Sequence, residues 1–102
     1  MSKEIWRDVV GYEGYYQVSS SGRVRNPRTG KVLKPAYSHA GYLFIRLQKD
    51  GGGSNHRVHR LVGFAFIKNP FKYPQINHKN GIKDDNRVGN LEWCTLKQNM
   101  VH

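Results

Sequence analysis

The chain has 102 residues, 37% of them hydrophobic, and a mean hydropathy of -0.73, which predicts one small domain, or two very small ones that share a core, under a largely polar surface. Seventeen lysines and arginines against seven acidic residues give a formal charge of +10, the balance of a protein that binds a polyanion. The longest run of apolar residues and glycine, residues 61–67, is too short to cross a membrane, and no secretory signal is recognised. The single cysteine, Cys94, excludes an internal disulfide and a cysteine-ligated zinc site.

The positive charge is spread along the whole chain. Residues 1–50 hold nine basic and four acidic residues, and residues 51–102 hold eight and three, so each half carries +5. This distribution favours a continuous binding surface over a disordered basic arm. We therefore expect a nucleic acid as the partner, with no membrane and no small-molecule cofactor, and a cytoplasmic protein.

The first quarter of the chain has the composition of a small β-sheet. Residues 11–16 mix glycines with tyrosines, whose rings we expect to cover the sheet. Residues 16–25 are typical of a hairpin, with three serines and a glycine at its turn. Val18 and Val24 should then face inward.

Basic residues follow the strands of this predicted sheet. Strand alternation puts Arg23 and Arg25 together on the solvent face. A turn at residues 26–30 leads to a further short strand at residues 31–35. From composition alone, such a face is either solvated or a nucleic-acid contact. The residues concerned are Arg23, Arg25, Arg28, Lys31 and Lys34.

The middle of the chain predicts a hairpin and then a buried helix. Residues 42–48 alternate apolar and polar side chains and give the clearest strand, which we expect to be central. Residues 49–55 are rich in glycine and predict a flexible hairpin loop, after which residues 57–59 resume extended structure and pair with the first strand. Residues 60–67 are apolar all round, as in a short helix buried between two sheets, and Pro70 soon follows to stop it.

The last third predicts a strand, a loop, a second strand and a helix. Residues 74–76 are an apolar, β-leaning approach to His78, which stands just before an Asn-Gly turn signal and so at a strand end. A polar loop follows, and residues 91–94 then alternate as a half-buried strand should. Thr95 is typical of a helix N-cap.

This arrangement lets Asn99 converge with Asn77 and His78, although it stands more than twenty residues later in the sequence. Taken singly, each has an ordinary alternative, since a histidine in a turn, an amide at a strand end and an asparagine on an exposed helix face are all common. As a set at this spacing, and together with the family resemblance of the segments that hold them, they predict an active site.

Four segments of the second half carry a family resemblance: VHRLV at residues 58–62, INHK at 76–79, DN at 85–86 and NLEWCT at 90–95. They resemble the HNH homing-type endonucleases of phages and self-splicing introns. Residues 4–34, with a Trp, Gly-Tyr-Glu-Gly, Tyr-Gln-Val-Ser, Gly-Arg-Val pattern, resemble the small β-rich DNA-binding module often fused ahead of these nucleases.

The resemblance implies an α+β fold in which an N-terminal antiparallel β-sheet module, residues 1–50, is followed by an HNH ββα-metal nuclease unit, residues 51–102, the two sharing one core. It also implies a metal-dependent DNA endonuclease that hydrolyses phosphodiester bonds. We expect it to act on double-stranded DNA as a monomer or weak dimer and to nick one strand per subunit.

The resemblance also assigns roles within the site. His78 would be the general base, Asn77 and Asn99 would hold one divalent ion, Mg²⁺ or Mn²⁺, and Asn90 would support the catalytic group by tying down the long loop. A histidine, with an ordinary pKa near ~6.5, is largely neutral at cellular pH and can accept a proton. Some relatives carry aspartate in place of Asn77. Because a neutral amide is a weaker ligand for a hard cation, we expect the site of the free protein to bind metal poorly.

With the resemblance, DNA contact is the favoured role of the basic N-terminal face, and further contacts are expected from His59, Arg60, Lys79 and Lys97. For His59 two alternatives are open, a phosphate contact or a residue that merely closes the strand. Cys94 is expected to be a surface or edge thiol and not a nucleophile.

Two other functions compete with the nuclease. The first is a DNA-binding, regulatory module whose nuclease site has decayed at Asn77. The second is structural RNA binding, which fits the charge but leaves the polar cluster around His78 unexplained.

Overall fold

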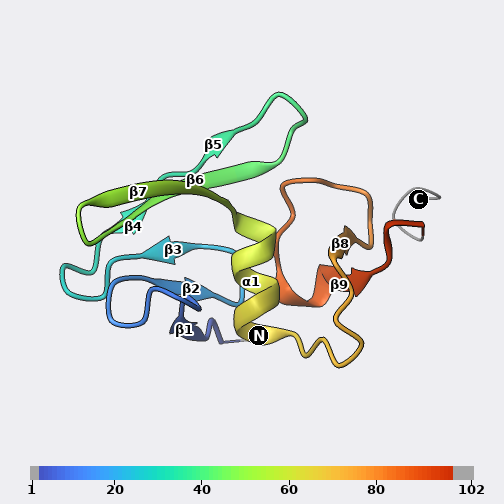
Figure 1. The fold of residues 1–102 in the computed structure, drawn as a ribbon, viewed down its shortest axis with the longest axis horizontal. Helices are drawn as coiled ribbons and strands as arrows, with labels where there is room; N and C mark the ends of the chain where they lie inside the picture. The colour runs from blue at the N-terminus through green and yellow to red at the C-terminus, as the bar shows by residue number, and fades with distance from the viewer. Residues whose placement is uncertain (1–2, 98–102) are drawn as a thin grey trace.

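The computed structural model describes residues 3–97, which form three small β-sheets around one helix (Figure 1). In chain order the elements are β1 (Trp6–Asp8), β2 (Gln17–Ser19), β3 (Val24–Arg25), β4 (Val32–Leu33), β5 (Ala36–Tyr37), β6 (Leu43–Lys49), β7 (Gly52–Arg57), α1 (Val58–Phe66), β8 (Gln75–His78), the 3-10 helix η1 (Val88–Asn90) and β9 (Leu91–Cys94). The predicted α+β fold is confirmed. Among residues 3–97 no helix is both long and apolar enough to span a bilayer.

All three sheets are antiparallel. Strands β1 to β4 follow one another in a meander, β5, β6 and β7 form a second sheet, and β8 pairs with β9 in a two-stranded ribbon. The strand predicted to be central, β6, is the middle strand of its sheet. Val18 and Val24 are buried, as strand alternation predicts.

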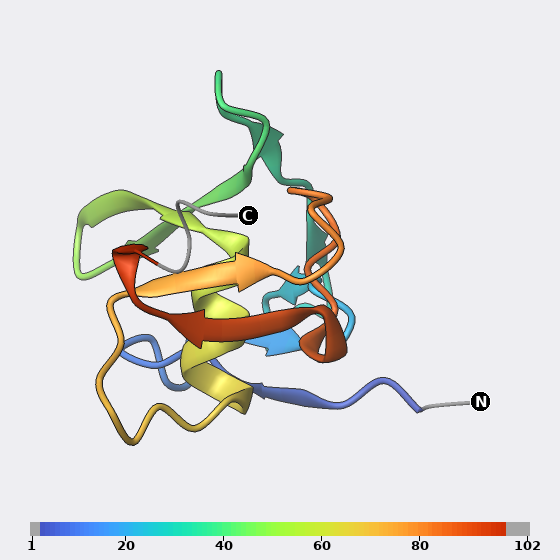
Figure 2. The ribbon, with the colours of Figure 1, turned by 90° about the vertical axis from the view of Figure 1, so that its right-hand side faces the viewer.

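Helix α1 lies between the N-terminal sheets and the β8–β9 ribbon, as Figures 1 and 2 show from two sides. Its buried residues Val58, Leu61 and Val62 are spaced three and four apart, so they fall on one face and join a single core. Gly63 faces the ribbon, where an added Cβ would meet Ile76 Cδ1 and come within 3.1 Å of Trp93 Cζ2. A glycine at this position therefore lets the ribbon approach the helix closely.

Two predictions for the middle of the chain are wrong. The glycine-rich stretch predicted as a loop is mostly strand β7, and the turn is confined to Asp50 and Gly51, whose φ angles of 53° and 81° are those of a tight hairpin turn matched to strand twist. Val58 and His59, predicted as extended, begin α1. The helix period of the buried side chains decides this, because it starts at Val58 and not at residue 60.

Cys94, predicted to be a surface or edge thiol, is only in part where it was expected. It lies on the edge strand β9, but its side chain is buried and not at the surface. Burial, and after it the charge of Glu92, raises the pKa of the thiol. The thiol therefore stays protonated at neutral pH and is a poor nucleophile.

Candidate active site

A cavity of about 410 Å³ opens where strand β8 ends. Its lining residues are Tyr42, Ile76, Asn77, His78, Lys79, Asn80, Gly81 and Lys83. The floor thus combines an imidazole, an amide and two ammonium groups. Asn77 and His78 are both buried, and a polar side chain that is buried in a protein is normally held by hydrogen bonds.

His78 is held by a side chain from the loop that follows β8. Its Nε2 lies 2.8 Å from Oδ1 of Asn86, and both residues are buried. The ring packs against two others, with centroids 5.1 Å from His59 and 5.8 Å from Tyr42. These contacts fix the orientation of the imidazole at the edge of the cavity.

Asn77 is held across the ribbon. The register of β8 and β9 puts it opposite Glu92, and its Nδ2 donates a hydrogen bond of 3.0 Å to Glu92 Oε1. An amide can ligate a cation only through its carbonyl oxygen, and the bond from Nδ2 leaves that oxygen, Oδ1, available; the predicted role of Asn77 as a metal ligand stays a prediction. Glu92 also adds a negative charge near the site, which the sequence reasoning overlooked.

Asn90 ties together two parts of the loop between β8 and η1 by hydrogen bonds. Its Nδ2 donates to the backbone oxygen of Asp85 at 2.8 Å and to Asn80 Oδ1 at 3.0 Å, and its Oδ1 accepts from the backbone N–H of Asn80 at 3.2 Å. Arg87 forms a two-pronged ion pair with Asp85 and holds the pKa of that carboxyl well below its usual range. The supporting role predicted for Asn90 stays a prediction.

The predicted metal ligand Asn99 lies outside the described residues. The chain turns helical at Leu96 and Lys97, immediately after Thr95. Lys97 is exposed at this point, and its predicted DNA contact stays a prediction.

His59 lies in the first turn of α1, so the alternative in which it closes a strand is wrong. It is buried, and Nδ1 has no hydrogen-bond partner within residues 3–97. Burial, and after it the nearness of His78, Arg57 and Arg60, lowers the pKa of His59 to about 3. The ring is therefore neutral at neutral pH and brings no positive charge to a phosphate.

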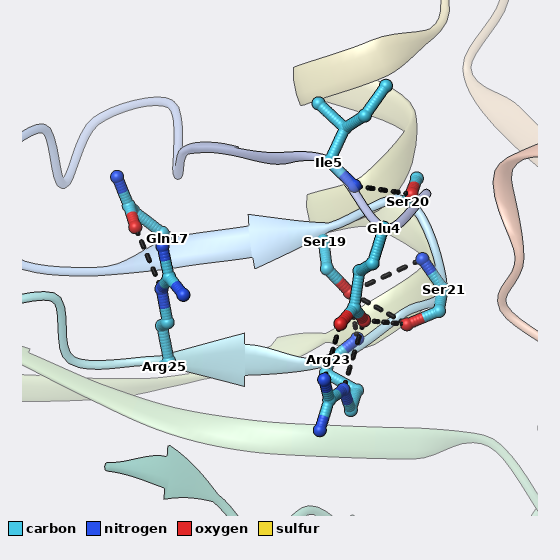
Figure 3. Close-up of polar contacts among 8 residues, drawn as sticks. All are labelled: Glu4, Ile5, Gln17, Ser19, Ser20, Ser21, Arg23 and Arg25. Atoms are coloured by element: carbon cyan, nitrogen blue, oxygen red, sulfur yellow. Dashed lines mark hydrogen bonds and ion pairs between the residues drawn. The ribbon is translucent and has the colours of Figure 1, made fainter. Parts of the chain in front are cut away.

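Arg23 and Arg25 both lie over the Trp6 ring, but they differ in their polar partners (Figure 3). Arg25 lies 4.0 Å from the ring centroid of Trp6 and donates from Nε to Gln17 at 2.9 Å. Arg23 forms an ion pair with Glu4 and lowers the pKa of that carboxyl to about 2, with help from Ser21. The charge of Arg23 is therefore largely compensated within the protein.

The other predicted basic contacts have different surroundings. Arg28 lies 5.7 Å from the Tyr15 ring, Lys31 and Lys34 are exposed, and Arg60 donates from α1 to the backbone oxygen of Pro74. Only Lys79 of the predicted set lines the cavity together with His78. Lys83 lines it as well and was not predicted, since nothing in the loop sequence distinguishes it from a solvated lysine.

Comparison with known proteins finds a family match in each half of the chain. Residues 4–48 match the NUMOD4 motif, and residues 56–101 match an HNH endonuclease family. The DNA endonuclease I-HmuI of Bacillus phage SP01 is 43% identical over 95 residues, which are 93% of this chain and 55% of I-HmuI. An uncharacterised HNH endonuclease, L245, of Acanthamoeba polyphaga mimivirus is 41% identical over 87 residues, which are 85% of this chain and 26% of that protein.

A solved structure agrees with these matches. The HNH homing endonuclease I-HmuI, described for its DNA binding and cleavage, superposes with a TM-score of 0.88 and 42% sequence identity over 95% of this chain and 56% of that chain. The chain spans about half of I-HmuI and about a quarter of the mimivirus relative.

Proposed function

The chain belongs to the HNH endonucleases that carry a NUMOD4 motif ahead of the nuclease unit, and from this premise we propose that it is a metal-dependent endonuclease that hydrolyses phosphodiester bonds in double-stranded DNA. One observation carries the proposal. His78 and Asn77 line the same cavity at the end of β8 together with Lys79 and Lys83. A proton acceptor, a ligand oxygen and positive charge for a phosphate thus meet in one place. I-HmuI, whose structure is described for DNA binding and cleavage, supports DNA as the substrate.

His78 is the proposed general base. In phosphodiester hydrolysis a base takes a proton from the attacking water, and such a base contributes ~10²–10⁴ in rate. The ring is buried on the side of Asn86, His59 and Tyr42 and borders the cavity, so it is held in place while it faces the substrate. Lys79 and Lys83 would attract the phosphate to it.

Asn77 Oδ1 and Asn99 are the proposed protein ligands of one Mg²⁺ or Mn²⁺. The orientation of the Asn77 amide by Glu92 fits this role, because it presents a carbonyl oxygen, the kind of donor that hard cations prefer. A bound ion would act as a Lewis acid on the phosphate oxygens. Within residues 3–97 no three His, Cys, Asp or Glu side chains gather into a metal-binding group, so the proposed site depends on amides, water and the DNA phosphate.

The organisation of the whole protein is part of the proposal. Residues 1–50 would act as the DNA-binding module and residues 51–102 as the nuclease unit. The basic residues predicted for contact, with Arg25 foremost, would bind the DNA backbone. One base and one metal site per chain imply that a monomer or weak dimer nicks one strand per subunit in the cytoplasm.

The second candidate, a DNA-binding module without nuclease activity, is favoured by one observation. Asn77 is a neutral amide whose Nδ2 donates to Glu92. A neutral amide binds a hard cation more weakly than the carboxylate of an aspartate at this position would. On this alternative the chain binds DNA and leaves it intact.

Incubation of the protein with supercoiled plasmid separates the two functions. The reaction is run with Mg²⁺, with Mn²⁺ and with a chelator, and the DNA-bound fraction is measured in parallel. The nuclease predicts nicked circles that appear before any linear DNA, and only with metal. Binding of the plasmid without nicking under any of these conditions would favour the second candidate.

A further inference from the structure

We propose that Asn86 is the residue that positions His78, and that the β2–β3 turn of the N-terminal sheet, through Gly22, holds Asn86 in place. The proposal rests on the proposed function insofar as His78 is the base. It assigns two residues that neither the sequence motif nor the predicted site had given a role.

The bond between His78 and Asn86 selects one form of the imidazole. Because Oδ1 of Asn86 can only accept, Nε2 of His78, at 2.8 Å, carries the hydrogen. The lone pair is then on Nδ1, which becomes the proton acceptor. When Nδ1 takes a proton, Nε2–H continues to donate, so a single oxygen serves the ring before and after the transfer.

The opposite orientation of the amide would defeat a base. Nδ2 of Asn86 would donate to Nε2, which would occupy the lone pair of His78 and leave the hydrogen on Nδ1. The imidazole would then have no nitrogen ready to accept a proton from water. The orientation with Oδ1 toward His78 is therefore the one that general-base chemistry requires.

Asn86 keeps this orientation at a cost. Its Nδ2 is buried and has no hydrogen-bond partner anywhere in residues 3–97, although buried donors in folded proteins are nearly always satisfied. A hydrophobic side chain of similar size would fill the space without an orphaned donor. An amide at this position is therefore explained by its Oδ1, which accepts a hydrogen bond from His78.

The N-terminal sheet contacts the nuclease loop at this same residue. An added Cβ at Gly22 would lie 2.9 Å from Cβ of Asn86 and 3.1 Å from its backbone oxygen, and the φ of Gly22 is +93°. Two residues further along the loop, the N–H of Val88 donates to the backbone oxygen of Ser20 at 2.9 Å. The loop between β8 and η1 thus lies directly against the β2–β3 turn (Figure 2). The β2–β3 turn of the N-terminal sheet therefore packs directly against Asn86, the residue that orients His78.

The ring nitrogens of His78 report this directly in ¹⁵N NMR spectra. The spectra are taken on the full chain without metal or DNA, at an alkaline pH where histidines are neutral, and a spectrum of His78→Ala assigns the signals. Wild type should show hydrogen on Nε2 and none on Nδ1. Asn86→Asp keeps the acceptor oxygen and should keep hydrogen on Nε2, whereas Asn86→Leu should give a mixture of both forms.

Gly22→Ala tests the contribution of the N-terminal sheet, with Gly11→Ala as its matched control. Gly11 has a φ of +88° and nothing within 4 Å of an added Cβ, so its substitution carries a similar backbone strain without the contact. Gly22→Ala should lose the single form of the His78 ring, and Gly11→Ala should retain it. Cleavage by Asn86→Leu and Gly22→Ala should fall about 10²-fold, the size of effect that a base misplaced by about 1 Å produces.

Three outcomes would overturn the proposal. They are hydrogen on Nδ1 of His78 in the wild type, loss of hydrogen from Nε2 in Asn86→Asp, and equal spectra for Gly22→Ala and Gly11→Ala. If Asn86→Leu does not fold, the wild type, Asn86→Asp and the glycine pair still decide. A wild type with hydrogen on Nε2 that cuts no DNA would count against the proposed nuclease and leave the positioning role intact.

Discussion

Asn77→Asp should trade stability of the free protein for metal affinity. The introduced carboxylate would lose the 3.0 Å hydrogen bond from the amide and face Glu92 instead. Two unit charges ~4 Å apart at an effective dielectric constant of ~20 repel by about 4 kcal/mol. Because Glu92 is half-buried and water screens part of the repulsion, we expect about 1–3 kcal/mol of destabilisation, within the usual range for a point mutation.

A divalent cation would reverse this effect. It attracts both carboxylates, so Mn²⁺ should bind free Asn77→Asp more tightly than it binds the free wild type, and a metal at 100 times its Kd restores about 2.7 kcal/mol. Thermal unfolding checks this, since 1 kcal/mol shifts the Tm of a domain of this size by roughly 4–8 °C. Asn77→Asp should melt below the wild type in chelator and rise steeply with Mn²⁺.

Two controls define the cause. Asn77→Ala removes the ligand without adding charge, so its Tm should not respond to Mn²⁺. Addition of Glu92→Gln to Asn77→Asp should relieve the loss of Tm seen in chelator. A wild type without DNA whose Tm rises with Mn²⁺ as much as that of Asn77→Asp, or an Asn77→Asp protein insensitive to Mn²⁺, would refute the assignment of Asn77 as a ligand.

Three further predictions follow from the contacts of the N-terminal sheet and the helix. Arg25→Ala should weaken DNA binding and reduce the slope of log K against log salt concentration by about 1. Arg23→Ala should reduce this slope less, because Arg23 is already paired with Glu4. Equal slopes for the two variants, measured by fluorescence anisotropy, would contradict this. Glu4 has a folded pKa lowered from 4.5 to about 2, so its stabilisation is full above pH 4.5 and is lost as the pH falls toward 2. Since the pair is partly exposed, urea titrations should show that the wild type loses about 1 kcal/mol more than Glu4→Gln over this window, and equal losses would contradict the assignment. Gly63→Ala should cost about 1–3 kcal/mol by overpacking the helix against the ribbon, whereas Gly89→Ala, with nothing within 4 Å, should cost far less in the same titration.

The strands of the second half could be predicted because their signals are local. The Asn-Gly turn after His78 and the alternation of residues 91–94 are written in neighbouring residues, and both strands form where they were expected. Strand β7 was missed because its glycines suggest a loop. Pairing with β6 decides the outcome, and Gly53 has a use there: an added Cβ would lie 2.8 Å from Nη2 of Arg46, so the glycine leaves room for that side chain.

The residues of the polar site were likewise predictable only where their sequence signals are local. Asn77 and His78 were found from a motif, since they are adjacent in the sequence. Glu92 and Asn86 lie within the motifs, but their roles could not be predicted, because their contacts depend on strand register and on the path of a loop. Gly22 stands 64 residues before the Asn86 that it contacts, and only the packing of the β2–β3 turn against the loop between β8 and η1 brings them together.

The most direct test of the central claim is a comparison of His78→Ala with His39→Ala in plasmid cleavage. His39 is exposed and outside the cavity, so its substitution controls for the loss of a histidine. Single-turnover rates in Mn²⁺ and DNA affinity are measured for both variants and for the wild type. His78→Ala should lose ~10²–10⁴ in rate with affinity changed no more than a few-fold, and His39→Ala should match the wild type. Cleavage by His78→Ala at the wild-type rate would show that another group, and not His78, takes the proton.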